Sequence, residues 1–205
     1  MLDVLTNGRA FKSTEYCREM QNVNHHNLMF AIPVYSDDPV THDYVVQSNG
    51  AFDETISGIL NLKASQQKVE VRIVIHKQTI ERLVRTCEFI SRNLRFVDHV
   101  ALMGLEITGF TRANLAQLWI DPFEYKNELS EAVGVLSHAG VPTSVYNHQL
   151  CVINDDVLGS YRKSISSWKN EFIDTCHECL RKSECGGFFS SSKMYRYSDH
   201  IQPFQ

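Results

Sequence analysis

Short runs of apolar residues alternate along the chain with longer stretches in which apolar residues recur at every third or fourth position. The short runs are rich in Val, Ile and Leu, which predicts β-strands that are buried on both faces of a sheet. The longer stretches predict amphipathic helices, whose apolar stripe faces a core. The strands are predicted at 28–35, 69–76, 97–106 and 143–147, and the end of a further strand at 4–8.

Helices are predicted between these strands, at 12–22, after Asp53, at 78–94 and from Asp121 to Gly140. We expect Asp53 and Asp121 to be N-caps, and the proline and glutamate that follow Asp121 strengthen that prediction. Gly140 is expected to end the last helix. The expected core stripes are Ile56, Ile59, Leu60 and Ala64, then Ile80, Leu83, Val84, Cys87, Ile90 and Leu94, then Leu129, Ala132, Val133 and Leu136.

Strands and helices that alternate in this way imply right-handed βαβ units and a parallel sheet. We count about five strands, whereas a closed barrel of this type needs eight strands and usually a longer chain. The fold class is therefore α/β, with either an open sheet or part of a barrel. The first strand lies so close to residue 1 that we expect the chain to begin within a domain.

The composition narrows the range of partners. Of the 205 residues, 43% are hydrophobic and 21% are charged, and the formal net charge is −4. This balance gives no electrostatic reason to expect nucleic acid or an anionic membrane surface as a partner. No apolar run approaches the length that spans a bilayer, and Asp3, Asn7 and Arg9 interrupt any signal-peptide segment. We therefore expect a cytoplasmic protein, in which clustered cysteines bind metal more often than they form disulfides.

Three of the six cysteines lie within ten residues, at Cys176, Cys179 and Cys185, and two glycines follow them directly. Cys151 lies upstream, after an apolar run. Four thiolates suit either a tetrahedral zinc ion or an iron–sulfur cluster of the [4Fe–4S] type. The sequence therefore predicts a cysteine-rich, metal-binding tail at 149–205. The alternative is that these residues are ordinary thiols.

Polar residues follow each predicted strand. Ligands of parallel α/β folds bind at the carboxyl ends of the strands, so these residues would share one rim. Glu106 is the strongest single candidate, because a carboxylate beside an apolar strand is costly to bury without a partner. The alternative is that loops after strands are polar in any fold. The rim residues are Thr6, Asn7, Tyr35, Ser36, His76, Lys77, Glu106, Asn147 and His148.

Six segments together carry a resemblance to a known family. They are Val4–Gly8, Ile32–Asp37, Val97–Glu106, Tyr146–Cys151, Ser166–Glu171 and Cys176–Gly187. In these segments the chain resembles a radical SAM maturase, and most specifically the maturase of the His-Xaa-Ser peptide-modification system. The resemblance covers essentially the whole chain. It implies a partial (β/α) barrel of the TIM type at 1–148, followed by the cysteine-rich tail.

The resemblance also implies an activity. Such enzymes depend on S-adenosylmethionine and an iron–sulfur cluster, and they modify a ribosomally made precursor peptide through a 5′-deoxyadenosyl radical. By this analogy an auxiliary [4Fe–4S] cluster, with zinc as the alternative metal, would be held by Cys151, Cys176, Cys179 and Cys185. S-adenosylmethionine would lie near Ser36, Arg72, His76 and Glu106.

The sequence departs from the family pattern in one respect. The C-x3-C-x2-C loop that binds the catalytic cluster is absent, as is the Gly-Gly-Glu segment, and the one early cysteine is Cys17. The first strand would then correspond to the third strand of the barrel. We therefore expect a truncated enzyme, one half of a split enzyme, or a degenerate relative. A second chain that completes the barrel would pair with the exposed strand edge at 4–7.

Two other hypotheses compete with the hypothesis of a radical SAM maturase. The chain could be a non-catalytic interaction module whose tail is stabilised by zinc or a cluster. It could also be a plain α/β domain with incidental cysteines. The metal and acid-labile sulfide content of the protein discriminates among the three hypotheses.

Overall fold

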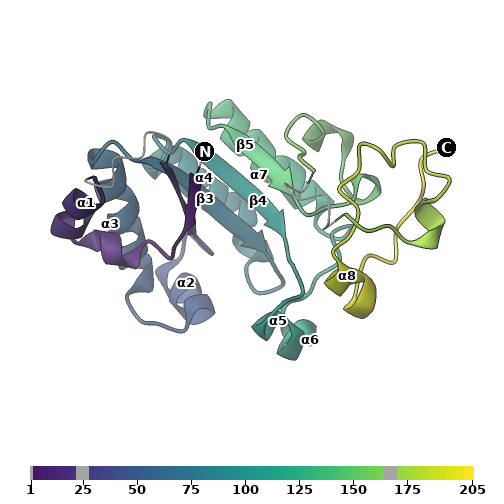
Figure 1. The fold of residues 1–205 in the computed structure, drawn as a ribbon, viewed down its shortest axis with the longest axis horizontal. Coiled ribbons are helices and arrows are strands. Elements are labelled where there is room, and N and C mark those ends of the chain that lie inside the picture. The colour runs from purple at the N-terminus through teal and green to yellow at the C-terminus, as the bar shows by residue number, and fades with distance from the viewer. Residues whose placement is uncertain (1, 22–27, 164–169) are drawn as a thin grey trace. The chain divides into compact units, whose positions relative to one another are not determined.

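The computed structural model describes residues 2–21, 28–163 and 170–205 and contains a five-stranded sheet (Figure 1). The strands follow one another in the sheet in the same order as in the chain. This arrangement confirms the predicted α/β class with a parallel sheet, and it is compatible with part of a (β/α) barrel. The strands are β1 (Leu2–Leu5), β2 (Leu28–Pro33), β3 (Lys68–Ile75), β4 (His99–Gly104) and β5 (Thr143–Tyr146).

The strands inside the sheet are buried on both faces, as their continuous apolar runs predict. Phe30 and Ile32 of β2 are completely buried, as are Val69 and Val71 of β3. The parallel register aligns Phe30 with Val69, and Ile32 with Val71. These four side chains therefore form continuous rows across neighbouring strands.

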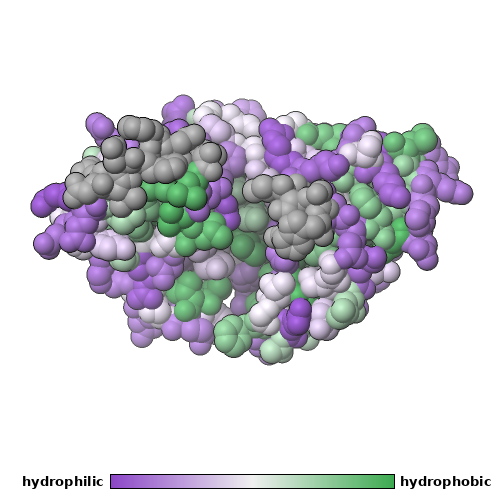
Figure 2. All heavy atoms as spheres, viewed as in Figure 1, coloured by the Kyte–Doolittle hydropathy of each residue, from purple (hydrophilic) through white to green (hydrophobic). Residues whose placement is uncertain are grey.

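β1 differs from the inner strands because β2 is its one neighbour in the sheet. Leu2 and Leu5 are 51% and 69% exposed, and hydrophobic residues lie over this strand in Figure 2. The exposed edge that the sequence predicted is therefore present among the described residues. An apolar strand edge of this kind is able to accept a further strand.

The helices are labelled in Figure 1. Among the described residues, none of them is long and apolar enough to cross a membrane. They are α1 (Thr14–Gln21), α2 (Pro39–Val46), α3 (Ala51–Ala64), α4 (Leu83–Asn93), α5 (Phe110–Ala113), α6 (Leu115–Leu118), α7 (Lys126–His138) and α8 (Ser190–Tyr195). Short 3-10 turns are η1 (Arg9–Lys12), η2 (Ile80–Arg82), η3 (Leu150–Val152), η4 (Asp155–Val157) and η6 (Asp174–Cys176).

The chain divides into two compact units. The first unit comprises Met1–Ile73, Arg85–Ala101 and Val135–Thr143, and the second comprises Val74–Val84, Leu102–Gly134 and Ser144–Gln205. The carboxyl ends of β3, β4 and β5 belong to the second unit, and so do the four cysteines of the tail. The predicted division into a barrel at 1–148 and a tail at 149–205 stays a prediction.

The α4 and α7 stripes were predicted well. Leu83, Cys87, Ile90 and Leu94 are buried in and just after α4, and Leu129, Ala132, Val133 and Leu136 are buried in α7. Gly140 adopts a positive φ of 72°, and its N–H and that of Val141 donate to carbonyls in the last turn of α7. Gly140 therefore ends this helix as predicted.

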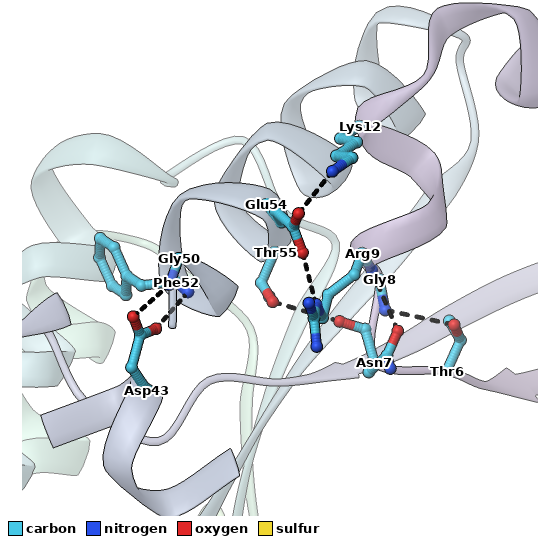
Figure 3. A network of polar contacts seen from close by, with 10 residues as sticks. All are labelled: Thr6, Asn7, Gly8, Arg9, Lys12, Asp43, Gly50, Phe52, Glu54 and Thr55. Atoms are coloured by element: carbon cyan, nitrogen blue, oxygen red, sulfur yellow. Dashed lines mark hydrogen bonds and ion pairs between the residues drawn. The ribbon is translucent and has the colours of Figure 1, made fainter. Parts of the chain in front are cut away.

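The expected N-cap residues were wrong. α3 begins at Ala51, so Asp53 lies inside its first turn. The cap comes instead from Asp43 of α2, whose carboxylate accepts hydrogen bonds from the N–H groups of Gly50 and Phe52 (Figure 3). Likewise, Asp121 closes a turn by accepting the N–H of Phe123, and α7 begins only at Lys126.

The expected apolar stripe of α3 was right at Ile59, which is completely buried, and wrong at Leu60 and Ala64, which are exposed. Leu60 is 46% exposed, whereas the buried face holds Phe52, Thr55, Gly58, Ile59 and Leu62. The reason is Gly58: a Cβ at this position would lie 2.1 Å from the carbonyl oxygen of Gly8. Without a side chain, α3 lies directly against the turn after β1, and this contact sets which helix face is buried.

The turn after β1 uses the polar residues that follow the strand. The Thr6 hydroxyl accepts the N–H of Gly8, and the Asn7 side chain accepts the N–H of Arg9 (Figure 3). Gly8 has a positive φ of 77°, which glycine adopts without strain. Arg9 and Lys12 then form ion pairs with Glu54 of α3. Thr6 and Asn7 therefore hold this turn in place.

Candidate metal centre

The cysteine-rich segment is a succession of tight turns. η6 ends at Cys176, and the N–H of Cys179 then donates to the carbonyl of Cys176 at 3.3 Å. The N–H of Cys185 donates to the carbonyl of Arg181 at 3.2 Å. Turns of this kind reverse the chain within a few residues, so thiols that are near in sequence point into one region.

All four tail cysteines line one cavity of about 350 Å³, a volume that includes the part open to solvent. Cys151 enters from the segment after β5, and Cys176, Cys179 and Cys185 enter from the tight turns. Each of the four is half-buried and none forms a disulfide. The structure therefore brings together the residues that the sequence predicted as metal ligands.

Two glycines fix the backbone beside Cys185. Gly187 has a positive φ of 64°, and a Cβ there would lie 2.4 Å from the carbonyl oxygen of Glu171. A Cβ on Gly186 would lie 2.9 Å from the Tyr161 hydroxyl oxygen. The N–H of Gly187 donates to the sulfur of Cys185 at 3.4 Å. A backbone N–H directed at a sulfur stabilises the thiolate, as at iron–sulfur sites.

Positive charge lies along the wall of this cavity. Arg181 and Lys182 both line it, and each cation lies over an aromatic ring that also lines it. The Arg181 guanidinium is 5.0 Å from the centre of the Phe204 ring, and the Lys182 ammonium is 5.2 Å from that of Phe172. These cations would offset the negative charge of several thiolates.

Burial raises the pKa of the Cys151 and Cys176 thiols. Repulsion from the other thiolates raises the pKa of both further, Cys185 being the strongest of these neighbours in each case. The N–H groups of Gln202 and Ile173 act in the opposite direction, on Cys151 and Cys176 respectively. The two thiols therefore hold their protons until a cation displaces them, as expected of metal ligands.

The spacing of the thiols bears on which metal they fit. A zinc ion holds four sulfurs within about 4 Å of one another, because each Zn–S bond is about 2.3 Å long. Within 2–21, 28–163 and 170–205, no three Cys, His, Asp or Glu side chains lie close enough together for a single ion. A [4Fe–4S] cluster carries its thiolates at separate iron corners and spaces them more widely. The described thiols therefore do not stand as a site for a single ion in this structure.

A buried pair lies next to this region. The Tyr125 hydroxyl and Nε2 of His148 are 2.9 Å apart, and Nδ1 of His148 is 2.7 Å from the carbonyl oxygen of Tyr146. The carbonyl fixes the proton on Nδ1, so Nε2 accepts the tyrosine proton. Burial lowers the pKa of His148 to about 4, against a smaller opposing effect of the Tyr146 carbonyl. His148 is therefore a neutral core residue and not a metal ligand.

We expect the stability of the protein to fall as the pH drops from 6.5 to 4. In this window the unfolded chain protonates His148 and the folded chain does not, which favours unfolding by on the order of 3 kcal/mol. His148→Gln should therefore flatten the dependence of the free energy of unfolding on pH, measured by urea denaturation. His138→Gln, on the exposed end of α7, is the control and should leave the slope unchanged. Equal slopes in wild type and His148→Gln would contradict this account.

Two of the predicted cofactor-binding residues lie in the first unit, and both have structural partners. Ser36 is completely buried, and its hydroxyl accepts the N–H of Asp38 at 3.1 Å. Nε of Arg72 donates to Glu70 at 2.6 Å. Burial would raise the pKa of Glu70, but hydrogen bonds from His99 and Arg72 outweigh burial and lower it. Their role in cofactor binding stays a prediction.

The other two predicted cofactor-binding residues lie in the second unit, just beyond the ends of their strands. His76 follows β3, is 3% exposed, and has its pKa lowered to about 4 by burial. Glu106 lies two residues beyond β4 and is half-buried. Among the described residues its carboxylate forms no hydrogen bond or ion pair. Glu106 therefore keeps the capacity for a ligand contact that the sequence suggested.

Sequence reasoning missed the partners that complete the cysteine cavity. Residues 201–204 of the C-terminal segment line it, and the N–H of Leu180 donates to the carbonyl of Phe204 at 3.0 Å. The Tyr161 hydroxyl donates to the carbonyl of His148 at 3.0 Å and lies against Gly186. No motif marks these residues. The aromatic residues of the tail are the one signal in the sequence that points to packing around the cysteine loop.

Of the segments that carry the family resemblance, part of Ser166–Glu171 lies outside the described residues, namely 166–169. Asn170 and Glu171 are described. Glu171 exchanges two backbone hydrogen bonds of 2.8 Å with Phe188. This bridge connects the segment to the residues that follow the cysteine loop.

The comparisons with known proteins concern the fold. No family model and no curated protein matches the chain. A domain of pyruvate-formate lyase-activating enzyme from Bacteroides vulgatus ATCC 8482 is similar in structure, with a TM-score of 0.52 and 13% identity, over 70% of this chain and 79% of that one. SuiB of Streptococcus suis is similar with a TM-score of 0.51 and 13% identity, over 70% of this chain but 32% of its own. At this level of identity the two similarities show the fold alone, so the chain shares its α/β fold with both proteins.

Proposed function

We propose that this chain is an iron–sulfur protein related to radical SAM peptide maturases, and that it holds an auxiliary [4Fe–4S] cluster. The observation that carries the proposal is the convergence of Cys151, Cys176, Cys179 and Cys185 on one cavity. Two further points support it: the fold shared with pyruvate-formate lyase-activating enzyme and SuiB, and the resemblance of the cysteine segment to the auxiliary-cluster region of radical SAM maturases. The most specific part of the proposal is the link to the His-Xaa-Ser system. It rests on the six sequence segments that resemble the maturase of that system.

The residues around the thiols suit this role. A bound cluster would supply a one-electron redox centre. The chain would provide four thiolates, an N–H directed at Cys185, and the cations of Arg181 and Lys182 on the wall. The aromatic rings of Phe172, Phe188 and Phe204 line the same cavity and would limit the access of water.

Catalysis would require groups beyond these four thiolates. The remaining cysteines, Cys17 and Cys87, are buried in the first unit, where Cys17 donates to the carbonyl of Phe11 and Cys87 lies in the core of α4. They are structural thiols. We propose that the loop for the catalytic cluster comes from a second chain or another part of a longer protein. S-adenosylmethionine would then lie near Glu106, Ser36, Arg72 and His76, the four predicted cofactor-binding residues.

The proposed partner is a ribosomally made precursor peptide in the cytoplasm, as the sequence resemblance implies. The open edge of β1 would receive the strands of the second chain. We propose no role for nucleic acid or a membrane surface.

Metal and acid-labile sulfide, measured on protein that is purified without oxygen, test the proposal. We expect about four irons and four sulfides per chain, with a broad visible absorption that reduction weakens. One zinc without sulfide would refute the cluster and support the non-catalytic, metal-stabilised module. Absence of metal in protein reconstituted with iron and sulfide would leave a plain α/β domain.

A further inference from the structure

The four thiols of the cysteine cavity come from two separate segments of the chain. Cys151 lies in the segment 148–151 that follows β5, which we call the Cys151 segment. The other three thiols belong to the tight turns at 176–187, which we call the Cys185 loop. Close spacing in the sequence keeps those three thiols near one another, but it sets no limit on their distance from Cys151. That distance depends on contacts between the two segments.

The Tyr161 hydroxyl makes one such contact. It donates to the carbonyl of His148 at 3.0 Å and accepts the N–H of Gly186 at 2.5 Å. His148 belongs to the Cys151 segment, and Gly186 directly follows Cys185. A Cβ on Gly186 would lie 2.9 Å from the hydroxyl oxygen, so the absence of a side chain there permits the close approach. One hydroxyl group thus joins both segments.

The sheet fixes the backbone that carries this hydroxyl. Tyr161 forms a parallel bridge with Val145 of β5, whose side chain is completely buried. The N–H of Val145 donates to the carbonyl of Ser160 at 2.8 Å, and the N–H of Arg162 donates to the carbonyl of Val145 at 2.9 Å. The hydroxyl therefore projects from a segment that is held by the sheet, which suits a residue that positions others.

Gln149 makes a second contact between the same two segments. Its side-chain amide donates to the carbonyl of Gly187 at 2.8 Å, in a buried hydrogen bond with which water competes poorly. Gly187 in turn donates its own N–H to the sulfur of Cys185 at 3.4 Å. Gln149 therefore acts on the part of the Cys185 loop that touches the Cys185 sulfur.

We infer that Tyr161 and Gln149 are positioning residues, which clamp the Cys185 loop against the Cys151 segment and so set the distance between the thiols of Cys151 and Cys185. Their use in holding a metal centre rests on the proposed function. Partners behind the ligands of a metal orient those ligands, and their loss typically weakens metal binding by about 10–100-fold. The clamp itself consists of hydrogen bonds within the chain, so it can be tested on protein without metal.

Cross-linking of the two thiols in metal-free protein tests the clamp. The background is Cys176→Ser/Cys179→Ser, which leaves Cys151 and Cys185 as the thiols of the cavity. The probe is dibromobimane, which becomes fluorescent only after both of its bromomethyl groups have alkylated thiols, and peptide mapping identifies the linked pair. We expect the background protein to cross-link. Tyr161→Phe should slow the second alkylation about tenfold, because it keeps the ring but loses both hydrogen bonds.

Two further variants in the same background sharpen this test. Gln149→Met keeps the length of the side chain, removes the second contact and should also slow the cross-link. Tyr44→Phe makes the same chemical change as Tyr161→Phe on an exposed face of α2, and should cross-link like the background protein. If Tyr161→Phe fails to fold, as its Tm would show, the comparison of Gln149→Met with the background protein decides the question.

Iron release tests the use of the clamp in the metal centre. Chains with all four cavity cysteines are reconstituted with iron and sulfide without oxygen and then exposed to a chelator. Tyr161→Phe should lose its iron at least about tenfold faster than wild type, and Tyr44→Phe at the rate of wild type. Equal rates in Tyr161→Phe and wild type would overturn the role of the clamp in holding metal.

The inference is overturned if Cys151 and Cys185 do not cross-link in the background protein, if both clamp variants cross-link at the background rate, or if Tyr44→Phe slows the reaction equally. The metal centre can fail independently. A wild type that binds no metal, together with slower cross-linking in both clamp variants, would refute the metal centre and leave the clamp. Iron in wild type, together with unchanged cross-linking in the clamp variants, would refute the clamp and leave the metal centre.

Discussion

The double variant Cys176→Ser/Cys179→Ser is expected to lose its iron and sulfide almost completely, from about four of each per chain to less than about 0.5. Both thiols line the cavity, and the N–H of Cys179 donates to the carbonyl of Cys176 at 3.3 Å, so the two residues are near neighbours. A serine hydroxyl is a poor ligand for iron, and removal of two of four ligands leaves too few to hold a cluster. Metal analysis and the visible spectrum give the result.

Cys17→Ser is the matched control. It makes the same chemical change at a buried thiol outside the cavity, and the serine hydroxyl can still donate to the carbonyl of Phe11. Its iron content should equal that of wild type. Full iron in the double variant would show that other residues hold the metal. Equal loss in the control would mean that the cluster is lost through general destabilisation.

Gly58→Ala is expected to destabilise the protein by about 3 kcal/mol, which corresponds to a decrease in Tm of roughly 6–12 °C. The added Cβ would lie 2.1 Å from the carbonyl oxygen of Gly8, and both groups belong to the backbone. No rotation of a side chain relieves such a contact, so α3 must move away from the turn that it covers. Thermal unfolding measures the effect.

Gly134→Ala provides the comparison, because Gly134 also lies inside a helix but has no atom within 4 Å of its would-be Cβ. Alanine has the higher helix propensity, so this variant should be more stable by about 0.5–1 kcal/mol. The same substitution should thus have opposite signs in α3 and α7. A decrease in Tm of similar size in both variants would contradict the role assigned to the contact between Gly58 and Gly8.

The elements that the sequence predicted best are those whose own apolar pattern determines their burial. The strands and the stripes of α4 and α7 belong to this group, because continuous or periodic apolar residues leave few alternative faces. Leu60 and Ala64 of the α3 stripe were mispredicted because a glycine, which carries no hydrophobic signal, sets the buried face. The caps were mispredicted because Asp43 reaches the start of α3 from another helix, and local spacing contains no such information.

The same distinction between local pattern and long-range contact applies to the residues of the candidate site. The cysteine pattern predicted the four thiols that line one cavity, since close spacing in sequence limits how far apart three of them can be. The contributions of Tyr161 and of the C-terminal residues depend on long-range contacts and were not predictable. Ser36 and Arg72 have hydrogen-bond partners within the fold, which no local pattern announced, and their role in cofactor binding stays a prediction.

The order of the strands has a consequence for biosynthesis. Because the order in the sheet matches the order in the chain, each new strand docks beside the one that was synthesised just before it. No strand has to insert between two that are already paired, so the sheet can form while the ribosome is still translating the rest. The thiols of Cys176, Cys179 and Cys185 leave the ribosome after all five strands have been synthesised. Loading of the proposed metal centre would therefore be a late step that acts on a chain whose sheet is already assembled.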